Sequence, residues 1–248
     1  MAASVAIISL ASDFGCQVQM TNMEDHLLDV LAQFDLAYWQ LASSGHLPET
    51  YDVAVIEGAV TTEEHVETLK RVREIASSVI VIGACAVSGG IPGLAAGSDL
   101  EPKVGCVYGD DGDIVACGRI SPMPVDAVID VDYRVLGCPI HPAEFVEVLQ
   151  RALMGLSDNA PQEPLCASCK VAENTCFYDG GQICLGLVTR TGCGARCVSH
   201  GRPCTGCRGI AEDANLASAR AIVTSYGMSP AAFDQALELY STCQEAIR

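Results

Sequence analysis

The first 156 residues alternate between short, continuous apolar runs and segments with apolar residues at helical spacing. The apolar runs occupy residues 4–10, 36–41, 53–57 and 79–83. A run without polar alternation is typical of a strand that is covered on both faces, as in a parallel sheet. Because helical segments lie between these runs, the pattern predicts an α/β fold with a flavodoxin-like, doubly wound parallel sheet.

Three segments of this part carry signals for the start of a helix. Thr21 with Glu24 resembles a capping box, Thr61 with Glu64 repeats that pattern, and Pro142 is a residue favoured at the first helical position. The apolar residues that follow are Leu27, Leu31 and Phe34; Val66, Leu69, Val72 and Ala76; and Phe145, Val148, Leu149 and Ala152. Their spacing predicts three amphipathic helices.

The pattern is weaker after residue 86, where Gly, Pro and Asp are frequent. A hairpin is predicted at residues 109–112 because two glycines flank two aspartates there. Further strands are predicted at residues 127–131 and 135–138, although aspartates weaken the first of them.

The composition changes at residues 157–164, which read SDNAPQEP and are typical of a linker. We therefore expect a flavodoxin-like domain at residues 1–156. A small, irregular domain at residues 165–248 should follow, ending in two helices at about residues 213–225 and from residue 229 onward.

Composition narrows the class of protein. The chain has 248 residues, half of them hydrophobic, and its mean hydropathy is +0.29, so it can bury a sizeable core. Its apolar runs are all shorter than 18 residues, which argues against a membrane-spanning protein. A net charge of −17 argues against binding nucleic acid, because phosphates are bound by clusters of Lys and Arg.

Eight of the fourteen cysteines fall within residues 166–207. They are Cys166, Cys169, Cys176, Cys184, Cys193, Cys197, Cys204 and Cys207. This segment has too few aliphatic residues to fold around a core of its own, so bonds to its sulfur atoms must hold it together. Eight thiolates divide into two sites of four ligands. Disulfides are disfavoured because the N-terminus lacks the basic stretch of a secretion signal, which predicts a cytoplasmic protein. The irregular spacing favours iron–sulfur clusters over zinc, and zinc stays open as an alternative.

Three further cysteines come after predicted strands. They are Cys16, Cys85 and Cys138. Since the carboxyl ends of the strands line one crevice in an open α/β sheet, these thiols should lie together. Asp13 stands three residues before Cys16, where the first cysteine of a Cys-x2-Cys pair would stand. Asp13 is therefore a candidate fourth ligand, and its alternative role is to cap the following turn.

Several of these segments carry a resemblance to a known family. The sequences DFGC (residues 13–16), GACAVSGGIP (83–92) and GCP (137–139) resemble the proximal-cluster motifs of nickel–iron hydrogenase small subunits. Related motifs occur in the 20 kDa subunit of respiratory complex I. CLGLVT (184–189), Cys193 and GRPCTGC (201–207) resemble the medial and distal cluster region of the hydrogenase subunits, which the complex I subunit lacks.

The resemblance implies three 4Fe-4S clusters. The proximal group is Asp13, Cys16, Cys85 and Cys138; the distal group is Cys166, Cys169, Cys176 and Cys184; the medial group is Cys193, Cys197, Cys204 and Cys207. Many members hold a medial 3Fe-4S centre with three cysteines, whereas Cys197 adds a fourth thiolate here. This departure resembles the cytosolic group 3-type hydrogenases, which are deazaflavin-reducing, methyl-viologen-reducing or sulfhydrogenase-like.

The implied function is that of an electron-transfer small subunit of a soluble nickel–iron hydrogenase. A partner large subunit would carry the nickel–iron site. Electrons would pass through the proximal, medial and distal clusters in turn to a flavin- or iron–sulfur-containing partner, linked to NAD(P), deazaflavin or ferredoxin. One alternative is an electron-transfer subunit of a complex-I-like oxidoreductase without nickel, and another is a zinc-stabilised scaffold without redox function.

Five other residues need an interpretation. We expect Cys106, Cys117 and Cys243 to be ordinary buried thiols. His200 is a candidate for a hydrogen bond to cluster sulfur. Glu57 ends a buried strand, where a carboxylate is costly unless paired, and it should face the crevice, with a role in proton movement or partner contact. The glycines near Cys85 match no phosphate-binding fingerprint, which argues against a nucleotide site.

Overall fold

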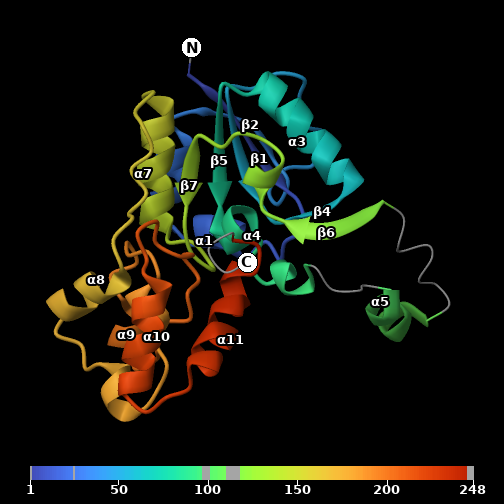
Figure 1. The fold of residues 1–248 in the computed structure, drawn as a ribbon. Coiled ribbons are helices and arrows are strands. Elements are labelled where there is room, and N and C mark those ends of the chain that lie inside the picture. Colours follow the sequence, from blue (N-terminus) through green and yellow to red (C-terminus); the bar gives the residue numbers. More distant parts are fainter. Residues whose placement is uncertain (1, 25, 97–100, 110–117, 245–248) are drawn as a thin grey trace.

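The computed structural model describes residues 2–24, 26–96, 101–109 and 118–244. Its centre is a five-stranded parallel sheet with the order β2-β1-β3-β5-β7 (Figure 1). The strands are β1 (Ser4–Ser9), β2 (Asp35–Trp39), β3 (Val53–Glu57), β5 (Ser78–Ile82) and β7 (Tyr133–Val135). This is the flavodoxin-like order, so the predicted fold class is confirmed.

Helices cover both faces of the sheet, which explains the continuous apolar runs. One face packs against α1 (Gly15–Thr21), α2 (His26–Leu31) and α7 (Pro142–Leu153). The other face packs against α3 (Glu63–Ile75) and α4 (Gly83–Ser88). Successive residues of a strand point to opposite faces, so Val55 belongs to the first core and Ile56 to the second, and both are fully buried.

Short elements connect this sheet to its surroundings. Strand β4 (Val60–Thr62) pairs antiparallel with β6 (Arg119–Met123). Between them lie η1 (Pro92–Ala95) and α5 (Glu101–Tyr108), and η3 (Val125–Ala127) follows β6. The hairpin predicted at residues 109–112 falls on residues outside the described part, apart from Gly109.

The predicted helix starts have mixed outcomes. Thr21 is the last residue of α1 and donates a hydrogen bond back to the Val18 carbonyl oxygen, so the capping box predicted there is wrong. The second helix begins one residue later than expected, because Thr62 is the cap and accepts a hydrogen bond from the His65 N–H at 3.2 Å. Pro142 begins α7 as predicted.

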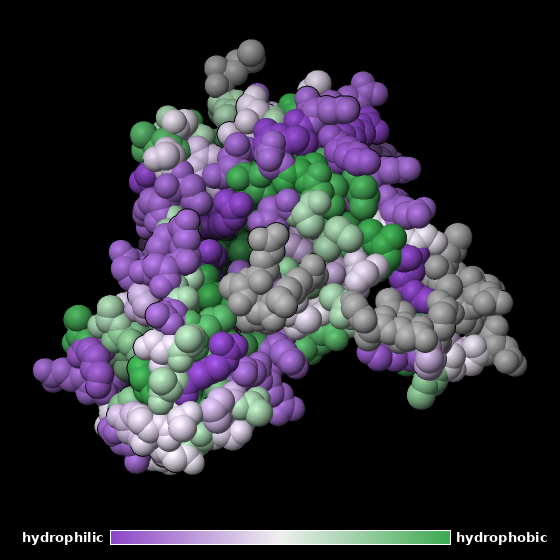
Figure 2. All heavy atoms as spheres, viewed as in Figure 1, coloured by the Kyte–Doolittle hydropathy of each residue, from purple (hydrophilic) through white to green (hydrophobic). Residues whose placement is uncertain are grey.

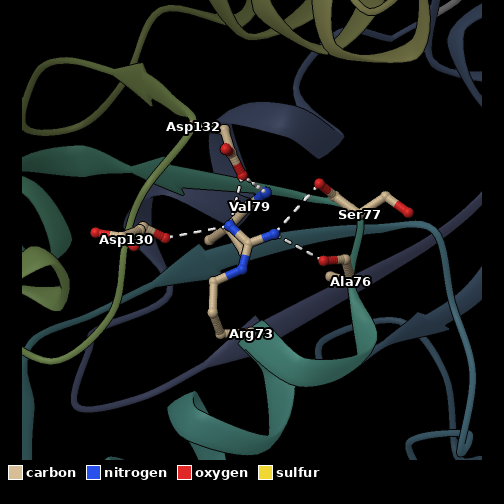
Figure 3. Close-up of polar contacts among 6 residues, drawn as sticks. All are labelled: Arg73, Ala76, Ser77, Val79, Asp130 and Asp132. Atoms are coloured by element: carbon tan, nitrogen blue, oxygen red, sulfur yellow. Dashed lines mark hydrogen bonds and ion pairs between the residues drawn. The ribbon is translucent and has the colours of Figure 1, made fainter.

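The strand predicted at residues 127–131 is wrong. Figure 3 shows the contacts of Asp130, near the end of this segment, and of Asp132, just after it. The Asp132 carboxylate accepts hydrogen bonds from Arg73 Nη1 at 2.6 Å and from the Val79 N–H at 2.7 Å, and Arg73 also donates to the Asp130 carbonyl oxygen at 3.2 Å. Residues 130–132 are therefore bound to the end of α3, and the chain then enters the sheet as β7. Strand β7 includes only the first residue of the strand predicted at 135–138.

The cysteine-rich part consists of short elements around its own small core. They are α8 (Leu165–Val171), η4 (Phe177–Gly180), η5 (Leu185–Leu187), α9 (Arg196–Ser199), α10 (Leu216–Ser225) and α11 (Pro230–Ser241). The two C-terminal helices are those predicted, although α10 begins three residues late. Asn215 caps it by accepting a hydrogen bond from the Ser218 N–H at 2.8 Å.

A buried ion pair joins the cysteine-rich part to the sheet part. Arg208 is 2% exposed, and its guanidinium donates to both carboxylate oxygens of Glu144 in α7, at 2.7 and 2.8 Å. It also donates to the carbonyl oxygens of Leu136 at 2.9 Å and Thr191 at 2.6 Å. Because Arg208 directly follows Cys207, this contact fixes a predicted ligand relative to the sheet.

Candidate functional site

The four residues of the proximal group meet at the carboxyl edge of the sheet. Asp13 follows β1, Cys16 lies in the first turn of α1, Cys85 lies in α4 and Cys138 follows β7. They line one cavity of about 460 Å³, together with Glu57. The predicted convergence of these side chains on one crevice therefore agrees with the structure.

Asp13 has the turn-capping contact that was its alternative role. Its Oδ1 accepts a hydrogen bond from the Gly15 N–H at 2.9 Å. The residue between them, Phe14, has a left-handed backbone with φ of 60°. Because only one carboxylate oxygen makes this hydrogen bond, the other can bind a metal in the cavity.

The thiols of this cavity raise one another's pKa values. Burial raises the pKa of Cys16 most, and the charge of Glu57 and then those of the other two thiols add to the shift. Burial also raises the pKa of Cys85 to about 11, with further contributions from Cys138 and Asp13. Such a set of donors disfavours its own deprotonation without a cation, and a metal reverses that balance.

The backbone of Gly83 lies close to the Cys16 thiol, and the absence of a side chain at Gly83 leaves space for it. Gly83 is the first residue of α4, directly after β5, and its φ is +82°. A Cβ on this residue would collide with Cys16 Sγ. Only glycine satisfies both the left-handed backbone and this contact. The start of α4, which carries Cys85, can therefore come directly against the Cys16 thiol.

Glu57 is paired, as its buried position requires. It is 2% exposed, and its two oxygens accept hydrogen bonds from the Cys16 N–H and from Gln17 Nε2, each at 2.9 Å. Gln17 also donates to the Ser9 hydroxyl, and its own carbonyl accepts from Trp39 Nε1 at 2.8 Å. The sequence patterns did not predict this network. They indicated only that Glu57 needs a partner; the signal for that partner was Gln17, a polar residue directly after a predicted ligand.

The distal group gathers around α8. Cys166 and Cys169 are three residues apart on this helix and so share a face. Burial raises the pKa of Cys166 to about 11, and the nearby thiols of Cys184, Cys169 and Cys176 contribute in that order. A Cβ on Gly186 would lie 3.5 Å from Cys166 Sγ and 3.6 Å from Cys184 Sγ, so this glycine keeps the space between the thiols open.

The medial group forms a third gathering of thiols. Burial raises the pKa of Cys207 to about 11, an effect that Cys193, Cys197 and Cys138 add to and a hydrogen bond with the Cys138 backbone opposes. A cavity of about 340 Å³ is lined by Cys193, Cys197, Cys207 and Cys138. Cys204 is buried, and burial raises its pKa to about 12, with Cys184 and Cys207 adding to the shift.

Two observations place the three groups in a row. Cys138 of the proximal group and Cys207 of the medial group line one cavity. The N–H of Cys204 in the medial group donates to Cys184 Sγ in the distal group at 3.2 Å. The medial group therefore lies between the other two. Among the described residues, no three His, Cys, Asp or Glu side chains are placed to hold a single metal ion.

The remaining candidates have separate outcomes. Cys106 is exposed on α5, so its predicted burial is wrong, whereas Cys243 is buried as predicted. Cys117 lies outside the described residues. His200 is exposed and its Nδ1 lies 2.8 Å from the Arg196 carbonyl oxygen, and its hydrogen bond to cluster sulfur stays a prediction. In the described part of the chain, no helix has the length and apolar character needed to cross a membrane.

Comparisons with known proteins identify the family. The family model "NADH ubiquinone oxidoreductase, 20 Kd subunit" matches residues 14–152. The chain is 33% identical to sulfhydrogenase 2 subunit delta of Pyrococcus furiosus, over 86% of this chain and 88% of that protein. It is 31% identical to a subunit of the vhu F420-non-reducing hydrogenase of Methanococcus voltae, over 95% and 90% of the two chains.

A solved structure gives the same assignment. The chain is similar to a subunit of an NAD+-reducing [NiFe]-hydrogenase in the H2-reduced state, with a TM-score of 0.56 and 25% identity. The match covers 65% of this chain and 96% of that one. The chain therefore belongs to the small, electron-transfer subunits of group 3 nickel–iron hydrogenases, in the family shared with the 20 kDa subunit of complex I.

Proposed function

We propose that this subunit relays electrons through three 4Fe-4S clusters, held by the proximal, medial and distal groups. The observation that carries the proposal is the linear order of the groups: Cys138 and Cys207 line one cavity, and the Cys204 N–H donates to Cys184 Sγ. When bound, each cluster takes up and releases single electrons at a potential set by its ligands and their hydrogen bonds.

The donor chemistry supports clusters rather than zinc. A zinc ion draws four thiolates to about 2.3 Å from one centre. The clustered cysteines are spaced irregularly along the sequence, which favours clusters over zinc, and Gly186 and Gly83 keep space beside thiols of the distal and proximal groups. Ligands of a cubane bind different iron atoms and so need such separation. The protein's part is to supply the thiolates, exclude water and donate hydrogen bonds to sulfur.

We propose Asp13 as the fourth proximal ligand. Its carboxylate lines the cavity with all three thiols, and its charge raises the pKa values of Cys85 and Cys138. A carboxylate is a harder donor than a thiolate and shifts the potential of iron bound to it. Asp13→Cys should move the proximal midpoint in a redox titration followed by EPR, whereas Asp35→Cys, at the opposite edge of the sheet, should not. An unchanged midpoint would contradict the ligand role.

We infer that the partners are a large subunit with the nickel–iron site and a flavin- or iron–sulfur-containing acceptor. The proximal cavity opens beside Ile91, which is 44% exposed, and a large subunit can cover it. The sulfhydrogenase and F420-non-reducing hydrogenase relatives support this kind of assembly.

The complex-I-like alternative is less favoured, since its family model ends at residue 152, before the eight clustered cysteines. We also propose a division into units 1–156 and 165–248, and a cytoplasmic location.

Metal analysis of the anaerobically purified complex tests the proposal. Twelve iron and twelve sulfide per chain are expected of three 4Fe-4S clusters in this subunit, once iron of the partner subunits is subtracted. Hydrogen uptake with viologen by the same complex distinguishes the hydrogenase from the complex-I-like alternative. A colourless chain that contains zinc would overturn the electron-relay function.

A further inference from the structure

The cysteine-rich part contains a long stretch without carboxylates. Residues 180–211 include four arginines and one histidine but neither Asp nor Glu, in a chain that has 31 acidic residues. Two of these arginines, Arg190 and Arg208, make side-chain hydrogen bonds to other residues. The other two, Arg196 and Arg202, are exposed. The stretch therefore presents positive charge on the surface of an acidic protein.

Helix α9 places these two arginines beside one cysteine. The inner side of the helix is buried, because Ala195 is fully buried and Val198 is 6% exposed in the core of the cysteine-rich part. Cys197 lies on the outer side, and of the eight clustered cysteines it alone is exposed. Its carbonyl oxygen accepts a hydrogen bond from the Arg202 N–H at 2.9 Å. This turn keeps Arg202 next to Cys197, which Arg196 directly precedes.

The exposed face of α9 reaches the medial group through a cavity. Arg196 and Cys197 line the cavity of about 340 Å³ that is also lined by Cys193 and Cys207. Among the residues that the structure describes, no carboxylate forms an ion pair with Arg196 or Arg202. A partner on this face would therefore meet two guanidinium groups without a carboxylate partner, next to a proposed cluster ligand.

The end of α8 extends the same face. The Asn174 side chain donates to the Ser199 hydroxyl of α9 at 3.0 Å, which links the turn after α8 to α9. Val171, the last residue of α8, is 85% exposed, and Lys170 beside it is exposed as well. One carboxylate, Glu173, lies in the same turn. An apolar residue bordered mainly by basic ones suits a protein partner with carboxylates at its surface.

We propose that this α9 face, formed by α9, Arg202 and the end of α8, is the docking surface for an acidic electron-transfer protein that exchanges electrons with the medial group. The inference rests on the proposed three-cluster relay and adds an exit at its middle cluster. In each transfer one electron passes from the reduced medial cluster to an oxidised cluster of the carrier, and oxidation of dihydrogen at the large subunit supplies that electron. Charge complementarity favours such a partner, because brief electron-transfer encounters depend on steering by opposite charges more than on a large interface.

The double variant Arg196→Gln/Arg202→Gln in the purified hydrogenase complex tests this inference. The probe is an acidic two-cluster ferredoxin, and methyl viologen, a small cationic acceptor, is the comparison. At low ionic strength the double variant should bind ferredoxin about tenfold more weakly in isothermal titration calorimetry, and kcat/KM for its reduction by dihydrogen should fall by a similar factor. Both differences should narrow at high ionic strength, because salt screens exposed charges, while reduction of viologen stays unchanged. Arg220→Gln is the matched control, since this partly exposed arginine of the same part pairs with Asp234 instead.

Several outcomes would contradict the docking role. Unchanged ferredoxin binding in the double variant, or binding that does not depend on salt, would overturn the inference. An equal loss of activity with methyl viologen would overturn it too, because the arginines would then act on the cluster itself. A change in self-association alone, measured by sedimentation of the complex, would mean that the face binds a second copy and that the inference is wrong.

A second variant covers the case in which the double variant loses iron. Arg202→Glu then decides, since Arg202 is outside the lining of the cavity. Weaker ferredoxin binding than in Arg220→Gln supports the inference, and equal binding contradicts it. Failure of the proposed relay would differ, because this subunit of the wild-type complex would then contain no iron and the complex would reduce neither acceptor.

Discussion

The two parts of this subunit are stabilised in different ways. The sheet part has two apolar cores, one on each face, built from β-branched strand residues and the helices over them. In the cysteine-rich part, Cys184 and Cys204 are members of the single core, and several other predicted ligands pack at its edge. We expect the first part to bury its core without metal, and the second, whose core includes thiols, to need metal bound to them.

The two parts also differ in net charge. Residues 1–164 contain 24 acidic and seven basic residues, whereas residues 165–248 contain seven of each. The whole net charge of −17 therefore belongs to the sheet part and its linker. In Figure 2 the surface around α3 is strongly hydrophilic, and the surface over the C-terminal helices is paler. A neutral surface around clustered thiolates limits their repulsion with the rest of the chain.

Removal of iron should affect the two parts most unequally. After chelation under anaerobic, reducing conditions, we expect residues 165–244 to lose most protection against hydrogen exchange, because metal-binding energy is folding energy in such a unit. Strand β3 should keep its protection in the same sample, as an internal control. If the cysteine-rich part stayed protected without iron, its apolar core alone would be sufficient, and the contrast would be wrong.

Loss of the ion pair between the parts should have the next largest effect. Arg208→Ala leaves Glu144 without its bidentate partner and should lower the free energy of unfolding by about 3–5 kcal/mol, measured by denaturant titration of the iron-loaded protein. Arg220→Ala is the matched control. The Arg220–Asp234 pair is largely exposed, so its loss should cost at most about 1 kcal/mol. Equal losses in the two variants would contradict the role of Arg208.

A smaller effect is expected within the sheet part alone. Gly83→Ala forces a Cβ against Cys16 Sγ at a left-handed backbone position and should cost about 1–3 kcal/mol. It should also lower the iron content by one cluster, measured by metal analysis, while the distal and medial EPR signals remain. Gly45→Ala is the control, since a Cβ there would have no atom within 4 Å. Full iron content in Gly83→Ala would show that the loop can adapt.

Sequence patterns predicted the elements that depend on burial. The strands around Val55 and Ile80 were predictable because both faces of the sheet are covered, which leaves an unbroken apolar run. The prediction of a strand at residues 127–131 was wrong because the Asp130 carbonyl oxygen accepts a hydrogen bond from Arg73, 57 residues away, instead of from a neighbouring strand. The prediction that Thr21 caps a helix was wrong because a pattern of only two residues also fits the end of a preceding helix, which is where Thr21 lies.

The candidate site was predictable only where a motif carries it. Strand ends and cysteine spacing indicated Asp13, Cys16, Cys85 and Cys138, and the structure brings these residues to one cavity. The partner of Arg208 was not predictable in this way. Its guanidinium binds Glu144, 64 positions away, and such a contact leaves no local trace in the sequence.

The position of Arg208 directly after Cys207 has a consequence for engineering. A designer who cut the chain in the segment 157–164 to obtain a portable two-cluster electron carrier would leave this guanidinium without Glu144 and without the Leu136 carbonyl oxygen. The cut would also remove Ser88 from beneath α11. A transplantable version would need a new acceptor for Arg208, or an apolar replacement of similar volume, before its cysteines could be expected to assemble around iron.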